Sequence, residues 1–259
     1  MASKPSTLAA VDGWPINVVD IDHAVAEVRA RIKSATGFTL FTLNVDHLVK
    51  LRQLEAFRAS YAKADLVTAD GAPVAFLGSR QGHSIQRTTG ADLVVPLAKM
   101  SAEEKSPIYL FGTNTPTLES AAKQLMQVTN EQLDIVALDA PEYGFDPEGE
   151  EADAVLERIR ASGARLCFVA LGAPKQEIFA RRAMEQGVPA GFICVGAALD
   201  FLSAPHTRAP KFMQNSGMEW LWRLARAPGR LTLRYAQCAI VLADVALRSV
   251  LSRPLARNQ

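Results

Sequence analysis

Two periodicities of apolar residues alternate along the chain and predict strands and helices in turn. Short apolar or β-branched runs predict buried strands, and apolar residues three or four positions apart predict helices with one buried face. Residues 39–43 form such a run, and Leu48 and Phe57 belong to the helical pattern that follows it. Between them, Asn44 has the type of side chain that caps a helix start. This stretch therefore predicts a strand, a tight loop and a helix.

The same alternation continues to about residue 202 and defines the expected fold. The expected strands lie at residues 16–19, 39–43, 65–68, 107–111, 134–138, 165–171 and 190–195. Strands that alternate with helices, without a linker or an internal repeat, are typical of a mostly parallel sheet with helices on both faces. We therefore predict a flexible N-terminus over residues 1–15 and a Rossmann-like α/β catalytic domain over residues 16–204. Residues 205–259 show only helical patterning, which predicts a helical C-terminal appendage.

The composition is that of a folded protein with a large core. The 259 residues are 49% hydrophobic and 21% charged. Cys167, Cys194 and Cys238 lie in apolar runs without CxxC spacing, so we expect reduced, buried thiols in a cytosolic compartment. No stretch reaches 18 apolar residues, and the first 15 residues lack the pattern of a signal peptide. The sequence therefore predicts a cytoplasmic protein that does not span a membrane.

The charge is distributed unevenly along the chain. The total is +1, but residues 205–259 hold nine Lys or Arg and two acidic residues, so the appendage carries +7 and the remainder −6. A basic appendage on an acidic body favours a phosphate-rich partner or an anionic membrane surface. Trp220, Trp222 and an apolar run at 231–250 that is interrupted by charges fit a helix lying on a membrane or packing on a partner. A solvated or core helical face is the alternative.

Polar residues follow two neighbouring predicted strands. Thr42 and Asn44 lie at the end of the strand at 39–43, and Asp70 follows the strand at 65–68. In open α/β sheets, the carboxyl ends of the strands form the edge at which ligands bind. We therefore expect these three residues to converge in a site. The alternative for Asp70 is a structural Asp-Gly turn.

Further strand ends offer groups that can bind an anion. Arg87 precedes a predicted helix, so its guanidinium and the helix-start amides can face one anion, although a plain surface arginine is the alternative. Gly112 and Thr113 precede a helix led by Pro116 and form a candidate phosphate cradle. The motifs GxGxxG and GxxxxGK(S/T) are missing, so this signal is weak by itself. Four more residues follow the last two strands: Gln176, Glu177, Gly196 and Asp200.

Asp20, Ile21 and Asp22 have the DxD form that some sugar transferases use to hold a metal–nucleotide complex. A metal needs several convergent oxygen ligands, whereas carboxylates at a helix start usually cap the helix and favour the positive end of its dipole. We therefore interpret these carboxylates as helix-start residues and predict no metal site.

Seven segments, in this order, resemble a known family. They read TLNVDHLVKL, ADLVTADGAPV, RTTGADL, YLFG, FVALGAPKQE, VGAALDF and RAPKFMQNSGMEWLWRLARAPGR. From about residue 16 to residue 234, the chain is similar to the WecG/TagA/CpsF family of bacterial glycosyltransferases. The resemblance implies transfer of a sugar from a UDP-sugar donor to a polyprenyl-diphosphate-linked sugar acceptor in cell-surface polysaccharide or exopolysaccharide biosynthesis. It also implies inversion at the anomeric carbon and a reaction that needs neither a metal nor a cofactor.

The resemblance suggests roles for individual residues. Asp70 matches the candidate general base of the family, and Thr42 and Asn44 match a T-x-N pair in its site. Arg87 and Gln176 match polar residues near the donor and its diphosphate. A single displacement needs such a base, an in-line approach and stabilisation of the departing UDP.

The resemblance extends into the appendage. Arg223 and Arg230 match arginines thought to close over the site and contact the diphosphate of the acceptor. Arg234 lies one position beyond the third arginine of this set and joins the expected substrate-binding residues. The expected partners are therefore a UDP-sugar, a lipid-diphosphate-linked acceptor and an anionic membrane surface, without a nucleic acid. We expect a peripheral protein on the inner face of the cell membrane, either a monomer or a homo-oligomer.

Two other classes of function stay open at this point. A nicotinamide-dependent oxidoreductase can use the same alternating sheet, although the missing glycine fingerprint argues against it. A non-catalytic, membrane-associated assembly subunit would need only the basic appendage. Thermal stabilisation separates them, because UDP should stabilise a transferase, NAD an oxidoreductase, and neither of them a scaffold.

Overall fold

A six-stranded parallel sheet forms the centre of the protein, with the strand order β4-β3-β8-β7-β5-β6. The computed structural model describes residues 6–203, 209, 213 and 219–251. The strands are β3 Phe38–Leu43, β4 Leu66–Ala69, β5 Ile108–Gly112, β6 Ile135–Asp139, β7 Leu166–Ala170 and β8 Gly191–Cys194. Every residue of β3, β4, β5, β7 and β8 is buried, whereas the edge strand β6 is partly exposed. Continuous burial is typical of parallel strands covered on both faces.

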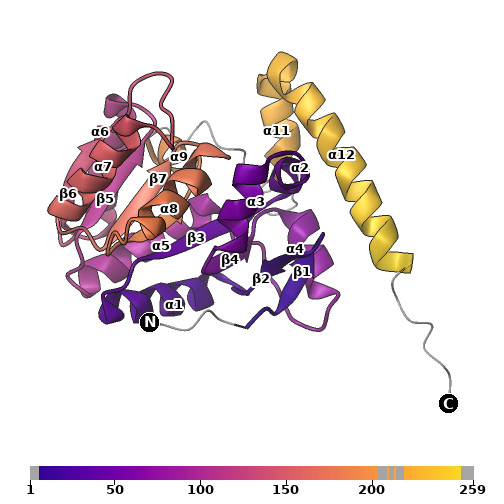
Figure 1. The fold of residues 1–259 in the computed structure, drawn as a ribbon, viewed down its shortest axis with the longest axis horizontal. Coiled ribbons are helices and arrows are strands. Elements are labelled where there is room, and N and C mark those ends of the chain that lie inside the picture. The colour runs from indigo at the N-terminus through magenta and orange to yellow at the C-terminus, as the bar shows by residue number, and fades with distance from the viewer. Residues whose placement is uncertain (1–5, 204–208, 210–212, 214–218, 252–259) are drawn as a thin grey trace.

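Helices cover both faces of this sheet (Figure 1). Their bounds are α1 Ile21–Ser34, α2 Val45–Gln53, α3 Glu55–Ala62, α4 Ala72–Ser79, α5 Gly90–Glu103, α6 Thr115–Val128, α7 Glu150–Ala161, α8 Lys175–Glu185, α9 Ala198–Ser203, α11 Glu219–Arg226 and α12 Pro228–Leu251. Successive side chains of a strand point to opposite faces. Phe41 and Leu43 of β3 therefore belong to the core cluster that α2, α3, α4, α7 and α8 line, whereas Leu40 belongs to the cluster that α1, α5, α6 and α9 line. The result is the predicted Rossmann-like α/β fold.

A short hairpin precedes this sheet and corrects the prediction for the N-terminus. The strands β1 (Ala9–Val11) and β2 (Trp14–Ile16) pair antiparallel, and Ala9, Val11 and Ile16 are buried. The Gln81 side chain exchanges two hydrogen bonds with the Ala10 backbone, at 3.0 and 2.6 Å. The expectation of a flexible segment over residues 1–15 is therefore wrong for residues 9–15, because apolar side chains anchor them to the body. The predicted strand at 16–19 ends at Ile16 instead.

The appendage helix α12 lies against α2 on the outside of the body (Figure 1). Val241 and Val245 are buried in the core cluster that α2 also lines. Ion pairs flank the contact and join Arg234 to Asp46 and Arg52 to Asp244, each at 2.7 Å. The described part of the appendage is therefore held on the body by both apolar and charged contacts.

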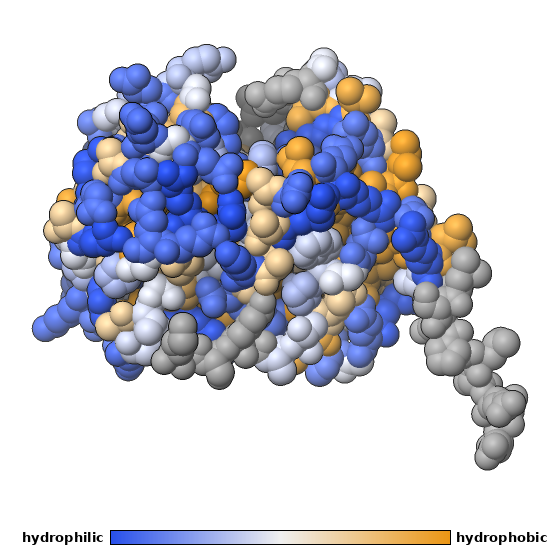
Figure 2. All heavy atoms as spheres, in the orientation of Figure 1, coloured by the Kyte–Doolittle hydropathy of each residue, from blue (hydrophilic) through white to orange (hydrophobic). Residues whose placement is uncertain are grey.

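The outer side of the appendage is apolar. Leu233, Ile240 and Leu247 recur every seven residues on α12 and are 71%, 70% and 60% exposed. Trp220 of α11 is 49% exposed. Figure 2 shows hydrophobic side chains gathered along the side of the molecule that α11 and α12 form. None of the helices among the described residues combines the length and the apolar character needed to cross a bilayer.

Candidate active site

The loops after β4, β3, β8, β7 and β5 bring together the residues predicted for the body of the site, and we call these loops the site edge. Because the strands are parallel, these loops all lie at one edge of the sheet. The connection that leaves β5 leads outward to β6, whereas the one that leaves β7 leads the other way to β8. Loops that diverge in this manner leave a crevice, and ligands of open α/β sheets bind at such a point. The residues predicted here are Thr42, Asn44, Asp70, Arg87, Gly112, Thr113, Gln176, Glu177, Gly196 and Asp200.

Asp70 and Asn44 are in direct contact. The Asp70 amide donates to the Leu43 carbonyl at 2.8 Å, so the two chain segments stay paired beyond the strands. Asn44 Nδ2 donates to Asp70 Oδ2 at 3.2 Å, and Asn44 Oδ1 accepts from the His47 amide at 2.9 Å. The second bond caps α2, so the same side chain starts the helix and orients the carboxylate. The predicted convergence of these two residues is confirmed.

Thr42 lies deeper than Asn44. Its side chain is in β3, opposite Thr68 in the register with β4, and the residue is only 5% exposed. Strand alternation places it on the face of Leu40, which α5 and α9 cover. Thr68 Oγ1 on the same side donates to the Thr88 carbonyl at 2.9 Å, just before α5. Thr42 is therefore buried within β3, on the side of the sheet that α5 covers.

Arg87 adds a basic group beside the end of β4. It forms an isolated parallel bridge with Ala69, and its Nη1 lies 3.3 Å from Asp92 Oδ2. Asp92 also closes a capping box with Thr89 at the start of α5. The Arg87 guanidinium and the start of α5 therefore both contact the carboxylate of Asp92. An incoming anion would have to displace this carboxylate. Asp92 was missed by the sequence reasoning, although its spacing from Thr89 is that of a capping box.

Gly112 and Thr113 form a tight turn between β5 and α6. Gly112 has φ +121°, and a Cβ there would lie 2.4 Å from the Ala170 carbonyl oxygen, so no other residue fits. The Thr113 amide donates to the same carbonyl at 3.0 Å, and Thr113 Oγ1 donates to Asp200 Oδ1 at 3.0 Å. Asn114 then caps α6, whose first turn has no acidic residue. The positive end of this helix dipole is therefore uncompensated by a carboxylate of its own first turn.

Gln176 and Glu177 are buried in the first turn of α8. Gln176 is 3% exposed and Glu177 is fully buried. Gln176 Oε1 accepts from the Gly196 amide at 3.0 Å, and Gln176 Nε2 donates to Glu177 Oε1 at 2.8 Å. Burial raises the pKa of Glu177 to about 7. These two side chains therefore connect the loop after β7 with the turn after β8.

A buried pair that the sequence reasoning missed lies behind Asn44. His47 Nδ1 and the Tyr61 hydroxyl are 2.7 Å apart, and both residues are buried. Burial lowers the pKa of His47 to about 3, so the imidazole is neutral near pH 7. The pair joins α2 to α3, and Phe57 packs edge-on against both rings. Only the apolar pattern around His47 could have indicated its burial.

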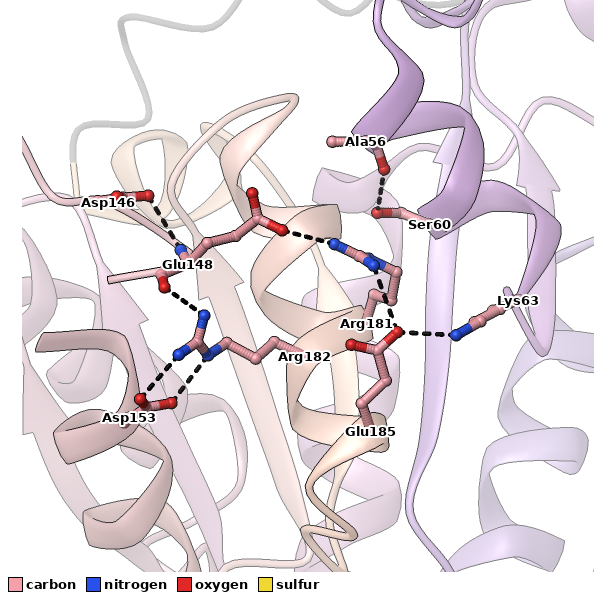
Figure 3. A network of polar contacts seen from close by, with 9 residues as sticks. All are labelled: Ala56, Ser60, Lys63, Asp146, Glu148, Asp153, Arg181, Arg182 and Glu185. Carbon is pink, nitrogen blue, oxygen red and sulfur yellow. Dashed lines mark hydrogen bonds and ion pairs between the residues drawn. The ribbon is translucent and has the colours of Figure 1, made fainter. Parts of the chain in front are cut away.

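An ion-pair network fixes α8 from its solvent side (Figure 3). Arg181 pairs with Glu148 at 2.7 Å, and Arg182 forms a bidentate contact with Asp153 at 2.8 and 2.7 Å. Glu185 pairs with Lys63 at the end of α3 at 2.8 Å. The helix that carries Gln176 and Glu177 is thus tied to α3, α7 and the loop before α7.

The appendage arginines are only partly within the described structure. Arg223 and Arg230 belong to α11 and α12, but their side chains lie outside the described residues. Arg234 is described, and its Nη2 lies 2.7 Å from Asp46 Oδ2. Asp46 is in the first turn of α2, which begins at Asn44. Arg234 thus joins the appendage to the helix that carries one side of the site.

The DxD carboxylates belong to the start of α1. Asp20 Oδ1 accepts from the His23 amide at 2.8 Å and caps the helix, and Asp22 lies in its first turn. The helix-start interpretation is therefore confirmed. Among the residues with described positions, no three or more His, Cys, Asp or Glu side chains gather as a metal site would require.

Two surface hollows of about 400 and 360 Å³ lie at the opposite edge of the sheet. The first is lined by residues before β5 and β7, such as Pro107 and Arg165, and the second by residues before β3 and β8, such as Gly37 and Pro189. These are amino ends of parallel strands, where ligands of open α/β sheets do not usually bind. We therefore locate the candidate site at the carboxyl edge.

A comparison with protein families identifies the class of this protein. The family model described as "Glycosyl transferase WecG/TagA/CpsF family" matches residues 9–255, which include the hairpin, the sheet, the whole site edge and α12. The matched range covers nearly all of the 259 residues. The protein is therefore a glycosyltransferase of cell-wall or polysaccharide biosynthesis, and the chain belongs to the glycosyl transferase WecG/TagA/CpsF family.

Proposed function

We propose that this protein transfers a sugar from a UDP-sugar to a polyprenyl-diphosphate-linked sugar acceptor, with inversion at the anomeric carbon. The observation that carries the proposal is the Asp70–Asn44 contact at the site edge, with a 3.2 Å hydrogen bond. It places a carboxylate with a fixed orientation at the edge where such sheets bind ligands. A single displacement requires one such base within reach of the acceptor hydroxyl.

Asp70 is the general base in this mechanism. Its carboxylate takes the proton of the acceptor hydroxyl while the acceptor oxygen forms a bond to the anomeric carbon. On the opposite side, the bond between that carbon and the diphosphate oxygen breaks, and UDP leaves with the electron pair. Asn44 holds the Asp70 carboxylate through Nδ2, so the base is oriented before the acceptor arrives. Thr42 is buried in β3, two positions before Asn44.

The leaving diphosphate is stabilised at the other end of the site edge. The α6 start, with Gly112 and Thr113 before it, has no acidic residue in its first turn and so favours an anion. Asp200 is held by Thr113 beside this turn, at 3.0 Å, and is a candidate for contacts to the hydroxyl groups of the donor. Arg87 supplies a guanidinium once the donor competes with Asp92 for it. The developing charge is thus met by protein groups, and we expect transfer to be insensitive to EDTA.

The appendage brings the lipid-linked acceptor to the site. Its exposed residues Leu233, Ile240 and Leu247 form one apolar face that can enter the interfacial region of a membrane. The net charge of +7 from residue 205 onward adds attraction to an anionic leaflet, about 1 kcal/mol for each basic residue near the surface. In this proposal the protein is peripheral on the cytoplasmic face, and Arg223, Arg230 and Arg234 contact the acceptor diphosphate.

Ligand stabilisation and a transfer assay test the proposal together. UDP at about 100 times its Kd should stabilise the protein by about 2.7 kcal/mol, and NAD should not. With a short-chain prenyl-diphosphate-sugar acceptor, the product should carry the anomeric configuration opposite to that of the donor, as read by NMR. Stabilisation by NAD instead of UDP, or retention of configuration, would refute the proposal. Loss of transfer in EDTA with recovery on adding Mn²⁺ would refute its metal-free mechanism.

The membrane part has a separate test. Ile240→Asp places a charge in the middle of the exposed face and should lower co-sedimentation with anionic liposomes at low salt by at least roughly tenfold. Ala239→Asp, at an exposed neighbouring position outside the row of large apolar residues, serves as the matched control. UDP binding should be unchanged in both variants. Equal liposome binding by the two variants would contradict the apolar-face contact.

A further inference from the structure

Glu177 is a buried carboxyl group with one oxygen that no group in the described structure satisfies. Its Oε1 accepts from Gln176 Nε2 at 2.8 Å, whereas Oε2 is buried and has no hydrogen-bond partner among the described residues. Burial of an unsatisfied polar atom costs free energy, so such groups usually serve a purpose other than stability. The proposed transfer mechanism does not use this group directly.

A chain of contacts leads from Glu177 to the start of α5. Gln176 uses both ends of its amide, with Nε2 on Glu177 and Oε1 on the Gly196 amide. Gly196 has φ +57° and lies in the turn between β8 and α9. The preceding residue, Val195, touches Gly90 so closely that a Cβ on Gly90 would lie 2.6 Å from the Val195 carbonyl oxygen. Gln176 therefore adds a side-chain hydrogen bond to a turn that the Val195 amide also ties to the Val169 carbonyl at 3.0 Å, and this turn bears directly on the α5 start.

Direct contact with substrate does not fit the burial of these side chains. Gln176 is 3% exposed and Glu177 is fully buried, so neither presents an open surface to a ligand. Their helix is also fixed from the other side, because Arg181 and Arg182 pair with Glu148 and Asp153 (Figure 3). A fixed helix and a buried amide are suited to holding the Gly196 turn in one position.

The groups around Glu177 link its protonation state to the strength of its hydrogen bond with Gln176. The groups that act on it or respond to it are Gln176 on the same helix, Tyr61 from α3, Cys194 from β8, and Lys50 and Asp46 from α2. Burial raises its pKa to about 7, and the Gln176 hydrogen bond opposes this by favouring the carboxylate. Since linkage is reciprocal, ionisation of Glu177 strengthens the bond to Gln176.

We propose that Glu177 is a positioning residue of the donor site: its carboxylate holds the Gln176 amide so that Gln176 anchors the Gly196 turn against the start of α5. This role rests on the proposed function, because the turn affects catalysis only if the site edge binds the donor. Glu177 itself touches no reacting atom. The anchor is firm when the carboxylate is ionised and weaker when it is protonated.

Hydrogen exchange of the Gly196 amide measures the anchor without any ligand. In Glu177→Ala, the protection factor of this amide should fall roughly tenfold, the size of one lost hydrogen bond. In the wild type, protection should rise between about pH 6 and about pH 8 as Glu177 ionises. Glu177→Gln keeps a side-chain oxygen that can accept from Gln176 Nε2, so this variant should fold. Its Gly196 protection should not rise with pH, because it has no carboxyl group at this position. Glu185→Gln, at the exposed end of the same helix, is the matched control and should keep it.

Two results would overturn the positioning role. One is unchanged Gly196 protection in Glu177→Ala. The other, which holds even if the alanine variant does not fold, is an equal pH-dependent rise in Glu177→Gln and the wild type.

Donor binding adds an independent readout. The Kd for UDP, measured at each pH in the wild type and in both Glu177 variants, should rise roughly tenfold in Glu177→Ala, in step with the loss of protection. Glu177→Gln should remove the difference in Kd that Glu177 ionisation causes in the wild type. If Gly196 protection responds as expected but no variant binds UDP, the proposed donor is wrong and the anchor stands. If UDP binds normally and Gly196 does not respond, the anchor is wrong and the proposed function stands.

Discussion

The two ends of the site edge differ in the charge that they offer. At the β4–β3 end, Asn44 holds the carboxylate of Asp70 in one orientation. At the β5 end, Gly112 and Thr113 lead into α6, whose first turn has no acidic residue. A displacement reaction needs a proton acceptor on one side of the reacting carbon and a stabilised anion on the other. The difference between the two ends therefore corresponds to the two halves of the proposed reaction.

The starts of α5 and α6 differ in the same way, because only the first turn of α5 carries an acidic residue. Asp92 completes a capping box at the α5 start and also pairs with Arg87, so the positive end of that helix is already compensated. The α6 start is capped by the neutral Asn114. An anion at α6 thus meets no carboxylate from the first turn of that helix, although Asp200 lies beside it on Thr113, whereas an anion that binds beside α5 must first displace Asp92 from Arg87.

The largest expected effect comes from removing the base. Asp70→Asn keeps the shape and the contact with Asn44, but turnover should fall by roughly 10²- to 10⁴-fold, the usual contribution of a general base. UDP affinity should change little, because the proposed diphosphate site lies at the other end. Single-turnover transfer and isothermal titration with UDP measure the two quantities. Asp22→Asn, at an exposed position in α1, is the control. Turnover close to the wild type in Asp70→Asn would contradict the assignment.

Glu177 lies between the two ends and should determine part of the pH dependence of stability. Its pKa is raised from the ordinary 4.5 to about 7 in the folded protein, so folding favours the neutral acid. This stabilisation is complete below about pH 4.5 and is lost as the pH rises through about 7, by roughly 3 kcal/mol at most. Urea unfolding across this range should show a flatter profile for Glu177→Gln than for the wild type. Parallel profiles would show that Glu177 does not titrate in this range.

Gly112→Ala tests the β5 end. The added Cβ would lie 2.4 Å from the Ala170 carbonyl oxygen at φ +121°, so the turn must move. We expect a loss of about 1–3 kcal/mol in stability and weaker UDP binding. Gly163→Ala is the matched control, since Gly163 also has positive φ, at +72°, but nothing lies within 4 Å of its Cβ position. Thermal shift with and without UDP separates strain, which both variants share, from damage to the site. Equal UDP binding by the two variants would place the diphosphate elsewhere.

The smallest effect is expected at the joint between the appendage and the β3 end. Arg234→Ala removes a pair with Asp46 whose arginine side chain is 47% exposed, so the loss should stay below about 1 kcal/mol after solvent screening. A double-mutant cycle with Asp46→Asn measures the coupling. Arg248→Ala, which removes a pair to Asp244 within α12, is the control. If Arg234→Ala leaves stability unchanged but slows transfer to the acceptor, the main role of Arg234 is to bind the substrate and not to hold the appendage on the body.

The sequence by itself determined the parallel sheet and the edge at which the candidate site residues lie. Continuous apolar runs record strands buried on both faces, and the polar residues that follow them mark their carboxyl ends. Asn44 and Asp70 were therefore predictable as neighbours. The apolar pattern did not predict where one helix ends and the next begins. A single apolar repeat runs through α2 and α3, because the buried residues of both helices belong to the same core cluster. The extended backbone of Leu54 separates the two helices.

Only the tertiary structure decided which strands and helices are neighbours. The order β4-β3-β8-β7-β5-β6 brings Gln176 to the Gly196 amide, and the docking of α12 brings Arg234 to Asp46 across 188 positions of sequence. Such contacts depend on the fit between whole surfaces, which no short stretch of sequence encodes. For the same reason, the burial that raises the pKa of Glu177 and lowers that of His47 became visible only in three dimensions.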